Sequence, residues 1–391
     1  MDSTVLQQNN LKSEDTKKVY FENLDFLRFI ACFIVFLGHS APHDLANLLP
    51  YSAYNKFVHL VTNGGLAVSF FFVLSGFLIT FLLLKEKEKT NTILVKEFYT
   101  RRLLRIWPLY LSVVFFGFCI YPYVKYLIGM NSVIPNDPIY YFSFLTNFDS
   151  IRLSHLGVLE VSSPEMLAVT WSVAIEEQFY LVWPLLFLIF PKKAYVYVLL
   201  ATITISCLFR YIHREDGATL YFHTLSVSSD LAIGGLMAYL TLFSTGFTNF
   251  FLTIKTKYIA LIYILGIAIL SNGVYLLPLL KDYAFALRIV STVFFAFVIA
   301  EQNISKHSIV KYSRFRVISY LGRYTYSFYL LHPIGIQMTI ILFRILRINH
   351  PSLTQEFFYT FLALIFSLLL SFVSFHFLEK PFLLFKKRFE V

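Results

Sequence analysis

Long uncharged stretches recur along almost the whole 391-residue chain, and they restrict its fold more than any other feature. Each is about 17 to 25 residues long, the length that an α-helix needs to cross the hydrocarbon core of a bilayer. They do not alternate between apolar and polar residues as membrane β-strands do. Since 57% of the residues are hydrophobic and 14% are charged, a soluble core does not account for them. The sequence therefore predicts an all-α polytopic membrane protein.

About ten transmembrane helices are expected, in a bundle that encloses a cavity. The predicted spans are 26–43, 64–84, 104–126, 170–190, 194–210, 222–244, 257–276, 284–302, 318–342 and 356–379. The aromatic stretch 138–148 is too short to cross, so we expect a re-entrant or interfacial piece inside an outer loop over 127–169. The chain divides into an N-terminal tail (1–23), a transmembrane domain (24–382) and a basic C-terminal tail (383–391). It has no internal repeat and no room for a second soluble domain.

The net charge of +10 comes from basic residues that gather in alternate loops. By the positive-inside rule these loops are cytoplasmic, which predicts a multi-pass plasma-membrane protein with both termini in the cytoplasm. Nucleic-acid binding is not expected, because no soluble domain remains to carry a basic face. The three cysteines, Cys32, Cys119 and Cys207, lie in apolar runs without disulfide or zinc spacing, so we expect buried packing groups.

The first span, "LDFLRFIACFIVFLGHS" at 24–40, carries Asp25, Arg28 and His39. Eleven residues of helix leave a rotation of about 20°, so Arg28 and His39 share one face about 16 Å apart along the axis. One long ligand could therefore touch both side chains. Asp25 and Arg28, spaced i, i+3, could instead form only a local ion pair.

Other ionisable residues inside the spans are candidates for a pathway or a site, because charge in a bilayer is costly. Glu176 and Glu177 begin the fourth span at the depth expected for His39, and adjacent residues cannot both face the cavity. Asp230 lies in the sixth span, and His332 lies in the ninth, where it could simply bond a carbonyl group freed by Pro333.

A basic cluster, "RRLLRIWP" at 101–108, lies at the end of the bundle where the first span begins. Arginine forks suit polyanions such as nucleotide phosphates, which makes Arg102 and Arg105 candidate ligands. The alternative is that they only set the topology or hold lipid headgroups.

Six stretches spread over nearly the whole chain form a further pattern; they are "LDFLRFIACFIVFLGHS", "FFVLSGFLIT" (71–80), "RRLLRIWPLY" (101–110), "WSVAIEEQFYLVWP" (171–184), "LGRYTYSFYLLHP" (321–333) and "FLEKPF" (377–382). Taken together in this order, they resemble the integral membrane acyltransferases of acyltransferase family three, which O-acylate cell-surface glycans and other acceptors. In the sixth span, relatives often have an arginine shortly before the aspartate, whereas this chain reads "TLSVSSD".

The resemblance implies that His39 is the catalytic histidine and that Arg28 belongs to the same motif. Arg102 and Arg105 match the arginine pair linked to acyl-CoA, and Glu176 with Glu177 match the paired acids of the fourth motif. Residues with an expected supporting role are Asp25, Ser75, Asp230 and His332. The implied donor substrate is acetyl-CoA or another acyl-CoA, and no metal is expected.

The implied acceptor is a saccharide or glycolipid at the outer face. Some relatives carry a C-terminal esterase-like domain that completes transfer; we expect none in this chain, and therefore direct transfer or a separate partner. The bilayer is the constant partner, and a homo-oligomer is compatible with the sequence. Acceptor contacts are expected in the loops 44–63 and 127–169.

Transfer of an acyl group from a thioester to an alcohol needs a base, and neutral His39 could take the proton, with Glu176 or Glu177 orienting the imidazole. In a second route His39 attacks first and carries the acyl group. Ser75 and Ser172 offer hydroxyl groups but are also typical close-packing residues. The rival from another class is a proton-coupled secondary transporter, which also has ionisable groups in its spans. A third hypothesis, an acyl sensor or scaffold, predicts that His39 is dispensable.

Overall fold

The structure, a computed structural model, describes residues 21–40, 58, 60–129, 136–158, 165–273, 276, 284–348 and 353–389. Within these ranges all regular structure is helical. Nine of the helical segments found there are long and apolar enough to cross a membrane. Their main helices are α2 (Glu22–Ser40), α4 (Gly64–Thr90), α5 (Val95–Phe115), α9 (Thr170–Ile189), α10 (Tyr195–Ile212), α12 (Thr224–Phe243), α16 (Ala284–Ile304), α18 (Thr325–Ile345) and α19 (Leu353–Ser374). The predicted all-α polytopic fold is confirmed.

The predicted span 257–276 is the one that does not form a straight crossing. It corresponds to α14 (Thr256–Ser271), which meets α13 (Thr245–Thr253) at an angle of 96°. Counting this bent pair as one span raises the total from nine to ten, in agreement with the expected number of about ten. At 16 residues, α14 alone is shorter than the roughly 20 residues that a perpendicular crossing needs.

The aromatic stretch at 138–148 forms two short helices instead of a span, as its length predicts. They are α7 (Pro138–Phe142) and α8 (Thr146–His155). Asp137 caps α7 by accepting a hydrogen bond from the Ile139 N–H, and Pro138 occupies the first turn, where its missing N–H costs nothing. Residues 130–135 and 159–164 of this loop, and residues 44–57 and 59 of the 44–63 loop, lie outside the described residues.

The closest helix crossing joins α4 and α12 through two glycines. A Cβ atom on Gly76 would lie 1.9 Å from the Leu231 carbonyl oxygen, and one on Gly234 would lie 1.9 Å from the Val73 carbonyl oxygen. Inside a membrane, where lipid tails are as apolar as leucine, small residues let helix backbones approach and gain dispersion energy. This crossing fixes α4, and with it Ser75, against the rest of the bundle.

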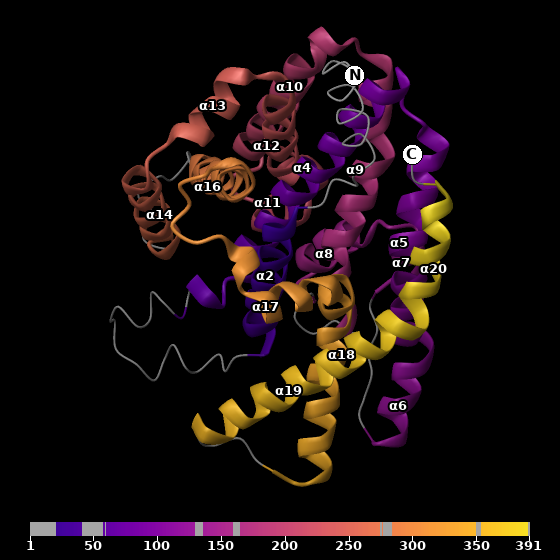
Figure 1. The fold of residues 1–391 in the computed structure, drawn as a ribbon. Coiled ribbons are helices and arrows are strands. Elements are labelled where there is room, and N and C mark those ends of the chain that lie inside the picture. Colours follow the sequence, from indigo (N-terminus) through magenta and orange to yellow (C-terminus); the bar gives the residue numbers. More distant parts are fainter. Residues whose placement is uncertain are drawn as a thin grey trace, which may run out of the picture.

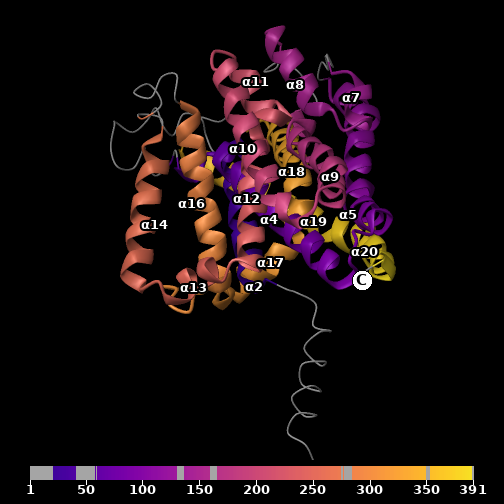
Figure 2. The ribbon, with the colours of Figure 1, turned by 90° about the horizontal axis from the view of Figure 1, so that it is seen from above.

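The helices lie around α2, which is in contact with α4, α17 (Arg316–Leu321) and α18. Figures 1 and 2 show α14 and α16 on one side of the bundle and α5 with α20 (Lys380–Lys386) on the other. The predicted basic tail over 383–391 is helical as far as Phe389, and the Phe389 carbonyl group accepts a 2.7 Å hydrogen bond from Arg101 on α5. The C-terminal segment is therefore a wall of the bundle at the end where α2 and α5 begin, which we call the basic end.

Candidate active site

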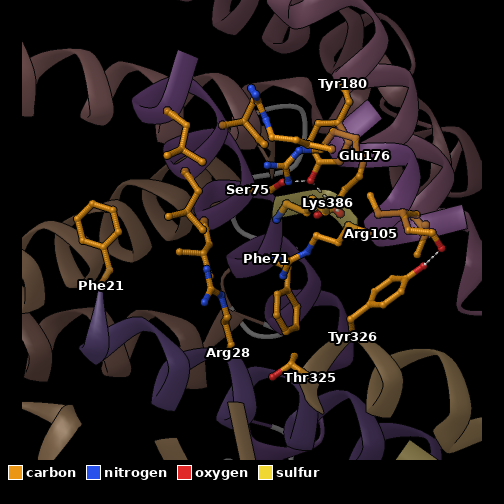
Figure 3. Close-up of a pocket in the computed structure, with 18 of the residues that line it drawn as sticks. Phe21, Arg28, Phe71, Ser75, Arg105, Glu176, Tyr180, Thr325, Tyr326 and Lys386 are labelled. Carbon is orange, nitrogen blue, oxygen red and sulfur yellow. Dashed lines mark hydrogen bonds between the residues drawn. The ribbon is translucent and has the colours of Figure 1, made fainter. Parts of the chain in front are cut away.

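A cavity of about 1290 Å³ opens among the helix ends at the basic end. Cations outnumber acids along its wall, and they include Arg28, Arg101, Arg102, Arg105, Arg323 and Lys386. They come from α2, α5, the turn before α18 and α20, so segments far apart in sequence supply one positive surface. Figure 3 shows Arg28, Arg105 and Lys386 around this space. Such a cavity suits a large anion, because arginine forks bind phosphate in a bidentate manner.

The three arginines at the start of α5 differ in what they contact. Arg101 is engaged by the protein itself, since it forms a 2.7 Å ion pair with Glu86 besides its bond to the Phe389 carbonyl group. Arg102 lies over the rings of Phe98 and Tyr180, and its buried Nε atom has no hydrogen-bond partner in the part of the chain described. Arg105 is exposed toward the cavity. Arg102 and Arg105, spaced i, i+3, therefore face the cavity together.

Arg28 lines the same cavity from α2, where it forms a 2.6 Å ion pair with Asp25. Asp25 is buried, so the pair also satisfies a carboxylate that would be costly to leave without a partner in a membrane protein. Arg28 thus forms the local ion pair and lines the cavity as well. Asp25 holds Arg28 at the cavity wall.

Glu176 and Glu177 diverge, as adjacent helical positions must. Glu176 lines the cavity and accepts a 3.2 Å hydrogen bond from the Tyr180 hydroxyl, which in turn lies 2.5 Å from the Ser75 hydroxyl. Because Tyr180 donates to the carboxylate, Ser75 donates to Tyr180, and Figure 3 shows this chain of three. Glu177 instead accepts a 3.0 Å hydrogen bond from the Trp107 indole. Only Glu176 is thus presented to a ligand.

His39 lies in the last turn of α2, at the opposite end of this helix from Arg28. Its Nδ1 atom is 3.0 Å from Nε2 of His332 on α18, and the two rings stack with centroids 5.2 Å apart. His39 is exposed, whereas His332 is completely buried. The expected contact between His39 and a glutamate is not present among the described residues, where the imidazole partner of His39 is another imidazole. The expected depth of the two glutamates did not predict where their carboxylates point.

The cavity and the histidine pair meet at Tyr329. Its side chain lines the cavity and lies 2.6 Å from the Ser172 hydroxyl, while its ring contacts that of His332 at 6.1 Å between centroids. Tyr329 and His332 are spaced i, i+3 on α18, so they lie on one face with a rise of about 4.5 Å between them. Tyr329 is therefore the cavity-lining residue of α18 whose ring contacts the histidine pair.

Asp230 lies outside the cavity wall and is completely buried. It accepts two hydrogen bonds, of 3.1 and 2.5 Å, from Arg288 on α16, and a third from Ser69 on α4. The arginine that relatives often carry just before this aspartate is absent, and another helix supplies the charge. Asp230 thus joins three helices and is not placed to contact a ligand in the cavity.

Several cavity residues were not singled out from the sequence. Tyr180 follows Glu176 by one helical turn, which was a usable signal, because i, i+4 positions are neighbours. Glu379, from the "FLEKPF" stretch, is 6% exposed, accepts hydrogen bonds from Ser327 and Ser374, and interacts electrostatically with Arg105. Nothing in the sequence alone shows that this acid reaches α5. In the part of the chain described, no group of His, Cys, Asp and Glu side chains is arranged to hold a metal ion.

Fold and cavity together define a multi-pass membrane protein with an arginine-lined cavity close to a pair of imidazoles. The sequence profile of the acyltransferase domain matches residues 21–376. The chain therefore belongs to this acyltransferase family.

Two relatives illustrate the similarity. The peptidoglycan O-acetyltransferase OatA of Listeria monocytogenes (strain EGD-e) is 27% identical over 348 residues, which cover 84% of this chain and 53% of the relative. The O-acetyltransferase OatA of Staphylococcus aureus (strain NCTC 8325) is 33% identical over 189 residues, or 46% of this chain and 30% of the relative. The matches thus span about half or less of the length of these relatives. No solved structure matches the chain.

Proposed function

We propose that the protein is a membrane O-acyltransferase that moves an acyl group, most simply acetyl, from cytoplasmic acyl-CoA to a hydroxyl group of a cell-envelope saccharide. The observation that carries this proposal is the arginine-lined cavity. One of its lining residues, Tyr329, contacts His332 of the His39–His332 pair. Membership of the acyltransferase family supports the reaction class. The names of the relatives, which refer to O-acetylation and to peptidoglycan, support acetyl as the group and peptidoglycan as the acceptor.

In this proposal the basic end faces the cytoplasm, where acyl-CoA is available, in accord with the positive-inside rule. Arg102 and Arg105, with Arg28 further along α2, hold the phosphates of the donor substrate. The pantetheine arm extends along the cavity toward Ser75, Glu176 and Tyr329. The positive charge of the cavity could instead serve to bind lipid phosphate, but that role would not account for the nearby histidine pair.

The reaction then needs a base for the acceptor hydroxyl, which at neutral pH is a weak nucleophile. His39 takes the hydroxyl proton while the acceptor oxygen attacks the thioester carbonyl carbon. The carbon–sulfur bond breaks as the new ester forms, and the departing CoA thiolate recovers the proton from the His39 imidazolium. The alternative in which His39 first carries the acyl group balances in the same way over two steps.

The test is purified protein in proteoliposomes with radiolabelled acetyl-CoA and peptidoglycan fragments, with free CoA and labelled saccharide both measured. We expect equal amounts of the two products, and a loss of about 100- to 10,000-fold in turnover for His39→Ala. His307→Ala is the matched control, because it removes an exposed imidazole at the basic end, away from the cavity. Full turnover by His39→Ala rejects the assignment of His39. If the wild-type protein releases no CoA, the enzyme proposal fails and the transporter hypothesis gains.

A further inference from the structure

His332 is more tightly specified by its surroundings than a packing residue needs to be. It is 0% exposed, and its ring contacts those of Phe36, Phe328 and Tyr329. Both ring nitrogens have a partner, since Nδ1 lies 3.2 Å from the Phe328 carbonyl oxygen and Nε2 lies 3.0 Å from Nδ1 of His39. An imidazole enclosed by phenyl rings is costly unless both nitrogens are bonded, and a leucine would fill the space without that cost.

The Phe328 carbonyl group, at one end of this series of hydrogen bonds, determines which nitrogens of His332 and His39 carry protons. A carbonyl oxygen can only accept, so Nδ1 of His332 carries its proton and donates to Phe328. In neutral His332 the other nitrogen, Nε2, then holds a lone pair and must accept. His39 therefore donates from Nδ1, and the lone pair of the neutral His39 ring lies on Nε2.

We infer that His332 is a positioning residue whose hydrogen bond keeps His39 in the Nδ1–H form, so that Nε2 of His39 is the atom that takes the acceptor's proton. This inference rests on the proposed function, in which His39 is the base. It assigns to a neutral imidazole, anchored on a backbone carbonyl group, the orienting role that an acidic side chain has in a serine–histidine–aspartate triad.

The arrangement also accommodates the charge that forms during the reaction. When Nε2 of His39 gains a proton, its Nδ1–H still donates to His332, so this hydrogen bond becomes charge-assisted and strengthens. His332 remains neutral and does not have to exchange its own proton. A hydrogen bond that is stronger in the transition state than in the ground state increases the turnover rate and not merely the affinity.

Two substitutions of similar size separate this role from simple packing. In His332→Gln the amide oxygen can take the place of Nε2 and accept from His39, whereas His332→Leu fills the space but cannot accept. We expect His332→Leu to lower kcat by about 100-fold while the KM for acetyl-CoA changes by less than about threefold, because the base and not the donor site is affected. We expect the kcat of His332→Gln to be about tenfold or more above that of His332→Leu.

Equal kcat values for the two variants, or wild-type turnover by His332→Leu, would overturn the inference. A measurement on the wild-type chain covers the case in which a variant does not fold. In protein labelled with ¹⁵N-histidine, the His39 resonances, assigned by their loss in His39→Ala, should have the shifts of the Nδ1–H form, and the Nε2–H form would also overturn it. Failure of the proposed function has a different signature, which is full turnover by His39→Ala itself.

Discussion

Tyr329 and His332 lie one turn apart on α18, and the tyrosine lines the arginine-lined cavity while the histidine bonds His39. The ring of Tyr329 also contacts the imidazole of His332, so this side chain connects the cavity wall to the histidine pair. Under the proposed function, the thioester must come into contact with Nε2 of His39 past this ring. If the proposal is correct, we expect Tyr329 to limit the access of water and of the acceptor to the donor.

Replacing Tyr329 by alanine is expected to uncouple donor cleavage from transfer. Removal of the ring connects the cavity to the space beside His332, so water can reach the thioester when no saccharide is bound. The ratio of CoA released to saccharide acetylated should rise above one, and CoA release should persist without acceptor. Tyr329→Phe is the control, since it keeps the ring and loses only the bond to Ser172, worth about 1 kcal/mol. A ratio of one in the alanine variant would contradict this role.

Alanine at Arg102 or Arg105 is expected to weaken donor binding. Each loses a charge-assisted hydrogen bond of about 1.5–3 kcal/mol, so the KM for acetyl-CoA should rise by about 10- to 100-fold, and the acceptor dependence should change much less. Steady-state kinetics with the donor varied would measure this. Arg316→Ala provides the comparison, because Arg316 is exposed at the same end of the bundle but does not line the cavity. A donor KM that is unchanged in both cavity variants would rule out the phosphate role.

The two adjacent glutamates should respond differently to the same change. Glu176→Gln removes the only charge of the Ser75–Tyr180–Glu176 chain at the cavity wall, so we expect kcat/KM to fall at least about tenfold. Glu177→Gln keeps an amide oxygen that can accept from Trp107, so its kcat/KM should stay within about threefold of the wild type. The opposite ranking would mean that Glu177 is the acid that acts in the reaction.

The α4–α12 crossing should not tolerate an added methyl group. Gly234→Ala places a Cβ atom against the Val73 carbonyl oxygen, and overpacking of this kind costs about 1–3 kcal/mol. We expect a lower unfolding temperature in detergent and less folded protein in the membrane. At Gly246, on α13, an added Cβ atom meets nothing within 4 Å, so Gly246→Ala should unfold like the wild type. Equal unfolding temperatures for the two variants would show that the crossing can spread at little cost.

The sequence predicted the helical bundle and the cavity's main residues because both depend on local patterns. Apolar length located the spans, and helix spacing placed Arg28 and His39 far apart on one continuous helix. Adjacent positions also indicated that only one of Glu176 and Glu177 would enter the cavity. Each of these predictions needs only the geometry of one helix.

What the sequence could not supply are relationships between helices. It placed Glu176 at the level of His39, but the rotation of α9 about its axis directs that carboxylate to Tyr180. The partner of His39 lies on α18, and the arginine bonded to Asp230 lies on α16. These pairings depend on how helices pack, which a single sequence without alignment does not reveal. The bend between α13 and α14 is likewise a tertiary feature.

The cavity that opens at the basic end has an electrical consequence for the membrane. Under the proposed function this charged cavity carries the potential of its side into the bundle, so we expect most of the transmembrane voltage to fall between Tyr329 and the opposite face. In the proposed reaction the polyanionic part of CoA stays on one side of this stretch, and the acyl group moves to the acceptor in exchange for the acceptor's proton, so no net charge crosses. Moving one charge across 100 mV costs about 2.3 kcal/mol, and this transfer avoids that cost. Acylation should therefore proceed at the same rate in energised and in depolarised membranes.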